Sequence, residues 1–285
     1  MKELLKSKKV VVYEVVPARG VDQSKCFYLC RSMVGAGADV IAVTDMPTSK
    51  VKIAPWAVGK MLVDEGIEVL LHFTRTSRNI LRIESDLLGI HLLGIKNILM
   101  LSGDKPEGGD YPNATVVNDI SIYDLIKLAK ILSEGVDLAR KRVKGNINFN
   151  VGAVFSAASD VDLERAAKKI ESGADFLISQ PLYDAKLLER AKEKLNVPIL
   201  VSVAFFSSEK QLKNFALVPG IEIPAELLEA VEGKDKEYIL EYTFEYLLKS
   251  IENMYKYADG FYISGIVKDA NRVRRLVEFV RNLQG

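Results

Sequence analysis

Glu14 is the side chain in this sequence that is best placed for acid–base chemistry. It lies inside the apolar segment Val-Val-Val-Tyr-Glu-Val-Val, residues 10–16, where a charged group needs a partner or a raised pKa. A glutamic acid whose pKa approaches neutrality can hold a proton at working pH and deliver it, so this position predicts a general acid. The alternative is a glutamate at a strand end that faces outward into solvent.

Other polar or aromatic side chains end the apolar segments that follow. In chain order they are Thr44, Asp45, His72, Asp104, Phe155 and Gln180. Each has a structural alternative, because threonine and glutamine can cap a strand and a single histidine often makes a structural hydrogen bond. Barrel enzymes assemble their active sites from the carboxyl ends of several strands. The set as a whole therefore predicts a binding site at such an edge.

Short segments rich in valine and isoleucine alternate with longer amphipathic segments along the whole chain. Eight are expected to be strands, namely 10–16, 40–44, 69–74, 98–102, 147–155, 176–180, 199–204 and 260–263. Helical periodicity occupies 80–93, 125–132, 163–170 and 187–195. This alternation is typical of parallel strands joined by crossovers, so we predict an α/β fold, a (β/α)8 TIM barrel. An open doubly wound sheet could give most of the same pattern.

Two segments exceed the minimal repeat. Residues 103–118 form a loop rich in glycine and proline, and residues 209–257 hold three helical patterns before the last strand. A long loop inside a compact domain is usually functional. The tripeptide Gly-Ala-Asp closes a helix and opens a strand at residues 37–39 and again at 173–175, which favours one repeating architecture. We therefore expect residues 1–285 to form a single catalytic barrel domain with extra helices before the last strand.

Charge and motif content exclude several classes of function. The 39 Lys and Arg residues nearly balance the 38 Asp and Glu residues, so no general field favours nucleic acid or an anionic membrane. No apolar run approaches the roughly 20 residues of a membrane helix, and we expect a cytoplasmic protein with small-molecule partners. Cys26 and Cys30 lack further ligands nearby, so no metal is predicted. Nucleotide-loop, serine-hydrolase and metalloprotease motifs are missing from the sequence, and His91 is interpreted as structural.

Three blocks of sequence carry a family resemblance. Residues 84–106 are Glu-Ser-Asp-Leu-Leu-Gly-Ile-His-Leu-Leu-Gly-Ile-Lys-Asn-Ile-Leu-Met-Leu-Ser-Gly-Asp-Lys-Pro, followed at 110–115 by Asp-Tyr-Pro-Asn-Ala-Thr. Residues 173–181 are Gly-Ala-Asp-Phe-Leu-Ile-Ser-Gln-Pro, and residues 219–224 are Pro-Gly-Ile-Glu-Ile-Pro. On these blocks the chain resembles the flavin-dependent methylenetetrahydrofolate reductase family, its catalytic barrel only. It resembles the branch of the family that is often fused to methyltransferase modules.

The resemblance implies an FAD across the barrel mouth and reduction of 5,10-methylenetetrahydrofolate to the 5-methyl form, with NADH or NADPH as electron donor. It implies that the proton of Glu14 helps to open the five-membered ring of the folate, and that Asp104 stabilises the resulting cation. Gln180 would hydrogen-bond the pterin, and Phe215 would pack on the aminobenzoate. The implied flavin contacts are Thr44, His72, Ser102, Gly103, Asp104, Phe155, Asp162 and Lys169.

The chain departs from the family pattern at three points. Ser102 stands where many members have arginine, residues 202–206 are Ser-Val-Ala-Phe-Phe in place of Gly-Ile-Leu-Pro, and the first strand ends in Val-Pro-Ala-Arg rather than a double proline. The carrier therefore stays open between tetrahydrofolate and another pterin, and the donor between a nicotinamide and an electron-donating partner protein. Two other functions also stay open: a redox-free pterin-binding methyltransferase barrel, and a non-catalytic barrel subunit that docks a methyltransferase or an electron carrier. A homo-oligomer is a further option.

Overall fold

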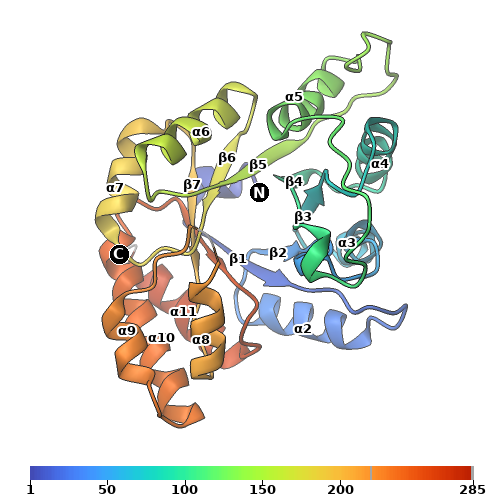
Figure 1. Ribbon diagram of the computed structural model, residues 1–285. Helices are drawn as coiled ribbons and strands as arrows, with labels where there is room; N and C mark the ends of the chain where they lie inside the picture. Colours follow the sequence, from blue (N-terminus) through green and yellow to red (C-terminus); the bar gives the residue numbers. More distant parts are fainter. Residues whose placement is uncertain (219, 284–285) are drawn as a thin grey trace.

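Eight parallel strands close into a barrel in the computed structural model of this protein, which describes residues 1–218 and 220–283. Strand β8 (Gly260–Ile263) returns to pair with β1 (Val10–Val15), with Val12 opposite Tyr262. Figure 1 shows the strands surrounded by helices. The predicted (β/α)8 TIM barrel is therefore confirmed, and the β1–β8 pairing rules out an open sheet. The predicted domain range of 1–285 and the resemblance block at 219–224 both include residues outside the described ones.

The other strands follow the predicted segments closely. They are β2 (Val40–Val43), β3 (Val69–Thr74), β4 (Asn97–Leu101), β5 (Asn150–Phe155), β6 (Phe176–Ser179) and β7 (Ile199–Val203). The main difference is that β5 begins at Asn150 rather than at residue 147. Because parallel strands are buried on both faces, they are almost continuously apolar, and this is why the sequence locates them well.

Helices precede, connect and follow the strands. They are α1 (Leu4–Ser7), α2 (Ser24–Gly35), α3 (Pro55–Asp64), α4 (Ile80–Leu92), α5 (Ile122–Ser133), α6 (Asp160–Glu171), α7 (Ala185–Lys194), α8 (Glu209–Ala216), α9 (Ala225–Val231), α10 (Lys236–Met254) and α11 (Ala270–Asn282), with short 3-10 helices η1 (Pro47–Ser49) and η2 (Pro106–Gly108). Cys26 and Cys30 are buried free thiols on α2. None of the helices within the described residues has both the length and the apolar character needed to cross a bilayer.

The interior of the barrel is filled below its mouth. Val10 and Val12 of β1 pack in one cluster with Phe176 of β6 and Leu200 of β7. Gly152 on β5 makes room for the Phe176 ring, since a Cβ at this glycine would lie 2.4 Å from it. Layers of inward-facing side chains of this kind seal a TM barrel. Only the upper inward positions, near the carboxyl ends of the strands, are therefore left to form a site.

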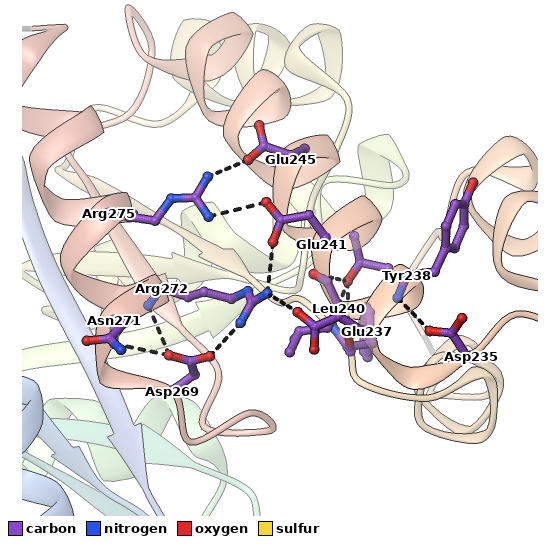
Figure 2. A network of polar contacts seen from close by, with 12 residues as sticks. Asp235, Glu237, Tyr238, Leu240, Glu241, Glu245, Asp269, Asn271, Arg272 and Arg275 are labelled. Carbon is purple, nitrogen blue, oxygen red and sulfur yellow. Dashed lines mark hydrogen bonds and ion pairs between the residues drawn. The ribbon is translucent and has the colours of Figure 1, made fainter.

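Helices α8, α9 and α10 make up the predicted extra segment, and they gather together with α11 on one side of the barrel (Figure 1). Phe206, Leu212 and Ile239 form part of a separate small core under this segment. Ion pairs tie α10 to α11, and Figure 2 shows Arg272 at the centre of them, with Glu241 at 2.8 Å. The segment thus has a small core of its own, while apolar residues of α10 such as Phe244 and Leu247 also pack in the main core.

Candidate active site at the mouth of the barrel

A cavity of about 620 Å³ opens at the carboxyl end of the barrel, within the ordinary size range of small-molecule sites. Every residue for which the sequence predicted a site role borders it: Glu14, Thr44, His72, Ser102, Gly103, Asp104, Phe155, Asp162, Lys169, Gln180 and Phe215. Asp45 borders it as well. The structure therefore brings the whole predicted set to one place, while the individual roles stay predictions.

Glu14 lies near the upper end of β1 and is hydrogen-bonded at the mouth of the barrel. The hydroxyl of Tyr262, on β8, donates to Oε2 of Glu14 at 2.7 Å. The same hydroxyl oxygen lies 2.9 Å from Nε2 of His72, on β3. The backbone N–H of Gly265 also hydrogen-bonds the Glu14 carboxyl group, and any Cβ at Gly265 would lie 2.2 Å from the Glu14 carbonyl oxygen. The Tyr262 hydroxyl thus links side chains of three strands, β1, β3 and β8.

Burial favours the neutral form of each member of this group. It raises the pKa of Glu14, an effect that the hydrogen bonds from Tyr262 and Gly265 offset in part. Burial, together with the nearby Glu14 charge, raises the pKa of Tyr262. It lowers the pKa of His72 to about 4, although the negative charge of Asp45 acts in the opposite direction. A glutamic acid that keeps its proton toward neutral pH is what a general acid requires.

Asp104 lies on the exposed rim of the cavity, in the loop after β4. Its carboxylate accepts the backbone N–H of Thr48 at 2.6 Å, and its carbonyl oxygen accepts the Ser49 hydroxyl at 2.9 Å. Met46, Thr48 and Ser49 have φ values of 48°, 56° and 52°, in a region that residues other than glycine rarely adopt. Backbone strain of this kind clusters at ligand sites. The strained turn after β2 thus holds the Asp104 carboxylate at the rim.

Asp45, by contrast, is neutralised from behind the cavity. Nη1 of Arg78 donates to its Oδ2 at 2.8 Å, and the Arg78 guanidinium also pairs with Asp86 at 3.2 Å and lies 4.8 Å from the Phe73 ring centre. Thr74 donates both its backbone N–H and its hydroxyl to Asp45, at 3.0 and 2.8 Å. Asp45 therefore joins the ends of β2 and β3 and is not a free acid.

Another part of the cavity wall is basic and comes from α6. Nζ of Lys169 donates to the carbonyl oxygen of Val154 at 2.6 Å. Burial and the neighbouring Arg165 lower the pKa of Lys169. Arg165 itself is largely exposed and pairs with Asp162 at 3.2 Å. This wall presents cations next to the buried ring of Phe155.

Gln180 directly follows β6, and Phe215 lies on α8. The backbone N–H of Gln180 donates to the carbonyl oxygen of Phe155 at 2.7 Å, which continues the β5–β6 ladder by one residue. The Phe215 ring packs edge to face on the fully buried Phe206, with the ring centres 5.2 Å apart. The small core under the extra helices thus positions an aromatic ring at the cavity.

The Thr44 hydroxyl tests whether the expected flavin fits. Its oxygen is buried at the cavity wall and finds no hydrogen-bond partner among the described residues. A buried polar atom without a protein partner needs an explanation, and a hydrogen bond to a bound group is one that agrees with its place at the cavity. Lys169 and Arg165 can meet the negative phosphates of a dinucleotide, and Phe155 offers a flat apolar surface. The donor set at the cavity therefore fits FAD.

Tyr262, Arg165 and the strained turn at Thr48 border the site but were not predicted from the sequence. For Tyr262 a signal exists, because the two-residue period of a strand places it on the same inward face as its partner Val12 and as Glu14. Arg165 lies one helical turn before Lys169 on α6. Nothing in the sequence marks Thr48, since its backbone conformation is unusual for threonine.

Comparisons with known proteins give a consistent picture. The family model described as methylenetetrahydrofolate reductase matches residues 1–273. A curated relative, methylenetetrahydrofolate reductase 2 of Schizosaccharomyces pombe, is 25% identical over 260 residues, which are 84% of this chain and 40% of that protein. Methylenetetrahydrofolate reductase (NADH) 1 of Arabidopsis thaliana is 28% identical over 177 residues, 58% of this chain and 30% of that protein. The matches thus span less than half the length of both relatives.

Among solved structures, the chain is similar to an uncharacterized protein from Clostridium thermocellum that binds two copies of 5-methyl-5,6,7,8-tetrahydrofolic acid. The TM-score is 0.68 at 13% identity, with 99% of this chain and 98% of that chain covered. At this level of identity the similarity concerns the fold alone.

Proposed function

The chain belongs to the methylenetetrahydrofolate reductase family, and on this premise we propose that its cavity reduces a methylene group on a tetrahydrofolate-type pterin to a methyl group, with FAD as cofactor. The observation that carries the proposal is Glu14. Its carboxyl group lines a cavity of ligand size, is hydrogen-bonded by Tyr262, and forms no ion pair within the described residues. Its raised pKa gives the site a proton donor where the substrate would lie.

FAD would supply the hydride transfer between a nicotinamide and the methylene carbon. Residues of the chain itself would hold the FAD. The Thr44 hydroxyl has no hydrogen-bond partner in the part of the chain that the structure describes, Lys169 and Arg165 offer positive charge, and Phe155 offers an apolar face. His72, Ser102, Gly103 and Asp162 border the same space and complete the proposed set of flavin contacts.

The remaining cavity residues would bind and polarise the folate. Glu14 would donate its proton to the substrate as the five-membered ring opens, and would be reprotonated from solvent before the next turnover. Asp104, held at the rim by Thr48, would place a negative charge near the positive charge that develops on the substrate. Gln180 would hydrogen-bond the pterin, and Phe215 would pack on the aminobenzoate.

Relatives and neighbours support the choice of ligands. The Arabidopsis relative is named as an NADH enzyme and the Caenorhabditis elegans relative as a probable NADPH enzyme, so a nicotinamide is the proposed donor. The Clostridium thermocellum neighbour binds a methyltetrahydrofolate, so a folate is the proposed carrier.

An anaerobic titration tests the proposal. Purified protein is reconstituted with FAD and reduced with NADH or NADPH, and methylenetetrahydrofolate is then added while the flavin absorbance is recorded. We expect a reduced donor to bleach the flavin and the folate to restore its colour, and methyltetrahydrofolate alone to bleach it in reverse. Protein that binds methyltetrahydrofolate but no flavin would instead support a redox-free methyltransferase barrel, and protein that binds neither would contradict both.

A variant pair tests the cofactor wall. Lys169→Met should weaken FAD binding about tenfold or more, since a hydrogen bond from a charged group is lost. Lys192→Met is the matched control, because Lys192 is a partly buried lysine on α7 that pairs with Asp259 away from the cavity. Equal affinities of the two variants for FAD would place the cofactor elsewhere.

A further inference from the structure

The hydrogen bonds around Tyr262 leave little freedom in where its hydrogen lies. A tyrosine hydroxyl has one hydrogen to donate, and in the structure it donates to Oε2 of Glu14 at 2.7 Å. The Tyr262 oxygen is also 2.9 Å from Nε2 of His72. While Glu14 is ionised, the only hydroxyl hydrogen is used in this way, so the second hydrogen bond requires His72 to donate from Nε2.

His72 satisfies that requirement in its neutral form. A neutral imidazole carries one hydrogen on one of its two nitrogens, and the ring of His72 is buried at 7% exposure. The hydrogen bond with Tyr262 assigns that hydrogen to Nε2. His72 is thereby oriented toward Tyr262, in addition to bordering the space proposed for the flavin.

We propose that Tyr262 and His72 are positioning residues that act through Glu14: His72 donates to the Tyr262 oxygen, commits the single hydroxyl hydrogen of Tyr262 to Glu14, and so sets the orientation and proton affinity of that carboxyl group. The role in turnover rests on the proposed function, but the hydrogen-bond chain itself does not. It runs from β3 through β8 to β1, and joins strands that are distant in the sequence.

Few other charged or titratable groups face Glu14. On its own strand, Tyr13 directs its hydroxyl to the carbonyl oxygen of Val267 at 3.1 Å. At the end of β2, the charge of Asp45 is matched by Arg78. After β4, the carboxylate of Asp104 is bound at the rim by Thr48.

Removing the Tyr262 hydroxyl should therefore change the proton affinity of Glu14 in a defined direction. The hydroxyl stabilises the ionised carboxylate, and burial stabilises the protonated form. In Tyr262→Phe the carboxylate loses its side-chain donor and keeps only the backbone N–H of Gly265, so Glu14 should keep its proton to higher pH. A hydrogen bond to a charged group corresponds to a shift of about one to two pH units.

The first experiment follows Glu14 directly. The carboxyl titration of Glu14 is recorded by infrared difference spectroscopy in flavin-free protein, with Glu14→Gln used to assign the band. Tyr262→Phe should move the midpoint to higher pH by the stated one to two units, and the alkaline limb of the folate half-reaction should move with it. Tyr13→Phe is the matched control, because it removes a buried hydroxyl next to Glu14 that does not touch the carboxyl group, and it should leave the midpoint in place.

The second experiment tests whether His72 acts through Tyr262. His72→Phe removes the donor and should raise the Glu14 midpoint by less than Tyr262→Phe does, whereas His72→Gln retains an N–H donor and should restore most of the difference. In the Tyr262→Phe background, His72→Phe should add no further shift. An additive shift in the double variant would mean that His72 acts on Glu14 by another route, and would overturn the proposed chain.

The third measurement needs no turnover at all. The sequence has two histidines, so nitrogen-15 spectra of labelled protein can be assigned with the variant His91→Gln. At pH values above the midpoint of the Glu14 titration, where this carboxyl group is ionised, His72 should appear as the Nε2–H tautomer. The Nδ1–H tautomer, or an unchanged Glu14 midpoint in Tyr262→Phe, would overturn the inference even if the protein reduces folate. Both expected results would uphold it even if folate is not the substrate.

Discussion

Two polar networks in this protein differ in whether their carboxyl groups are paired with cations. At the barrel mouth, Glu14, Tyr262 and His72 form a chain of hydrogen bonds without an ion pair to Glu14 among the described residues. Between α10 and α11, Arg272 and Arg275 are surrounded by carboxylates, as Figure 2 shows. The first network is built from single hydrogen bonds, and the second from matched opposite charges.

The pKa shifts reflect this difference. At the mouth, burial raises the pKa of Glu14 and favours the protonated acid. In the helix network, the hydrogen bond from Arg272 and the nearby arginines lower the pKa of Glu241, although burial alone would raise it. A network that favours neutral groups can keep a proton on its carboxyl group to higher pH than an exposed glutamate does, whereas a network of paired charges joins two helices. We therefore assign a chemical role to the network at the barrel mouth and a structural role to the network between α10 and α11.

Glu14→Gln is expected to have the largest effect. The amide keeps the shape of the side chain but cannot deliver a proton, so the folate half-reaction should slow about 10²- to 10⁴-fold. Reduction of the flavin by a nicotinamide should change far less. Stopped-flow absorbance of the two half-reactions, measured separately, checks this.

The matched substitution in the other network is Glu241→Gln. It also converts a glutamate to its amide, but on α10 and away from the cavity, and both half-reactions should keep their rates. If the two half-reactions lose speed equally in Glu14→Gln, the proposed role of Glu14 as an acid is wrong and its role is structural.

The pH dependence of stability should differ in sign between the two networks. Because the pKa of folded Glu14 lies above its ordinary value of 4.5, its contribution is fully present below 4.5 and is lost as the pH rises through the raised value. Glu14→Gln should thus gain stability relative to wild type over that window, about 1.4 kcal/mol for each unit by which the pKa is raised. Glu241 has a lowered pKa, so its contribution is present above 4.5 and is lost as the pH falls.

Urea unfolding of the wild type, Glu14→Gln and Glu241→Gln, measured from below pH 4.5 to neutrality, compares the two signs. If the free energies of unfolding of the two variants, relative to wild type, change with pH in the same direction, the two networks do not differ in this respect.

The same contrast shows what the sequence could predict. Eight apolar segments specified the strands, and Glu14 inside one of them was conspicuous because a charge there is costly. Tyr262 was not, because tyrosine is an ordinary strand residue and its contact with Glu14 exists only once β8 closes against β1. The positive φ of Thr48 and the burial of Arg78 between Asp45 and Asp86 are likewise products of tertiary structure. The sequence thus located the strand ends, but not the hydrogen bonds made across them.

Arg272→Met should destabilise the protein by about 1–2 kcal/mol, and Arg275→Met by about 0.5 kcal/mol or less. The Arg272 side chain is 14% exposed and reaches Asp269 at 2.7 Å and Glu241 at 2.8 Å. Its loss leaves the partly buried Asp269 carboxylate without this cation, whereas Glu241 keeps Arg275 at 3.3 Å. The Arg275 side chain is 48% exposed and pairs with Glu245 at 2.6 Å, where solvent screens the interaction. Urea unfolding at neutral pH measures both, and equal losses would show that burial does not distinguish the two arginines.

Added salt should have the smallest effect, and it should change only the network between α10 and α11. Added NaCl at about 1 M shortens the screening length to about 3 Å, so the small stability difference between wild type and Arg275→Met should vanish. The Glu14 chain contains no ion pair within the described residues and lies inside the barrel mouth, so the pH midpoint of the folate half-reaction should stay where it is. A midpoint that moves with salt would mean that a mobile or distant charge controls Glu14. In that case hydrogen bonding from Tyr262 could not be what sets its proton affinity, and the two networks would differ in degree rather than in kind.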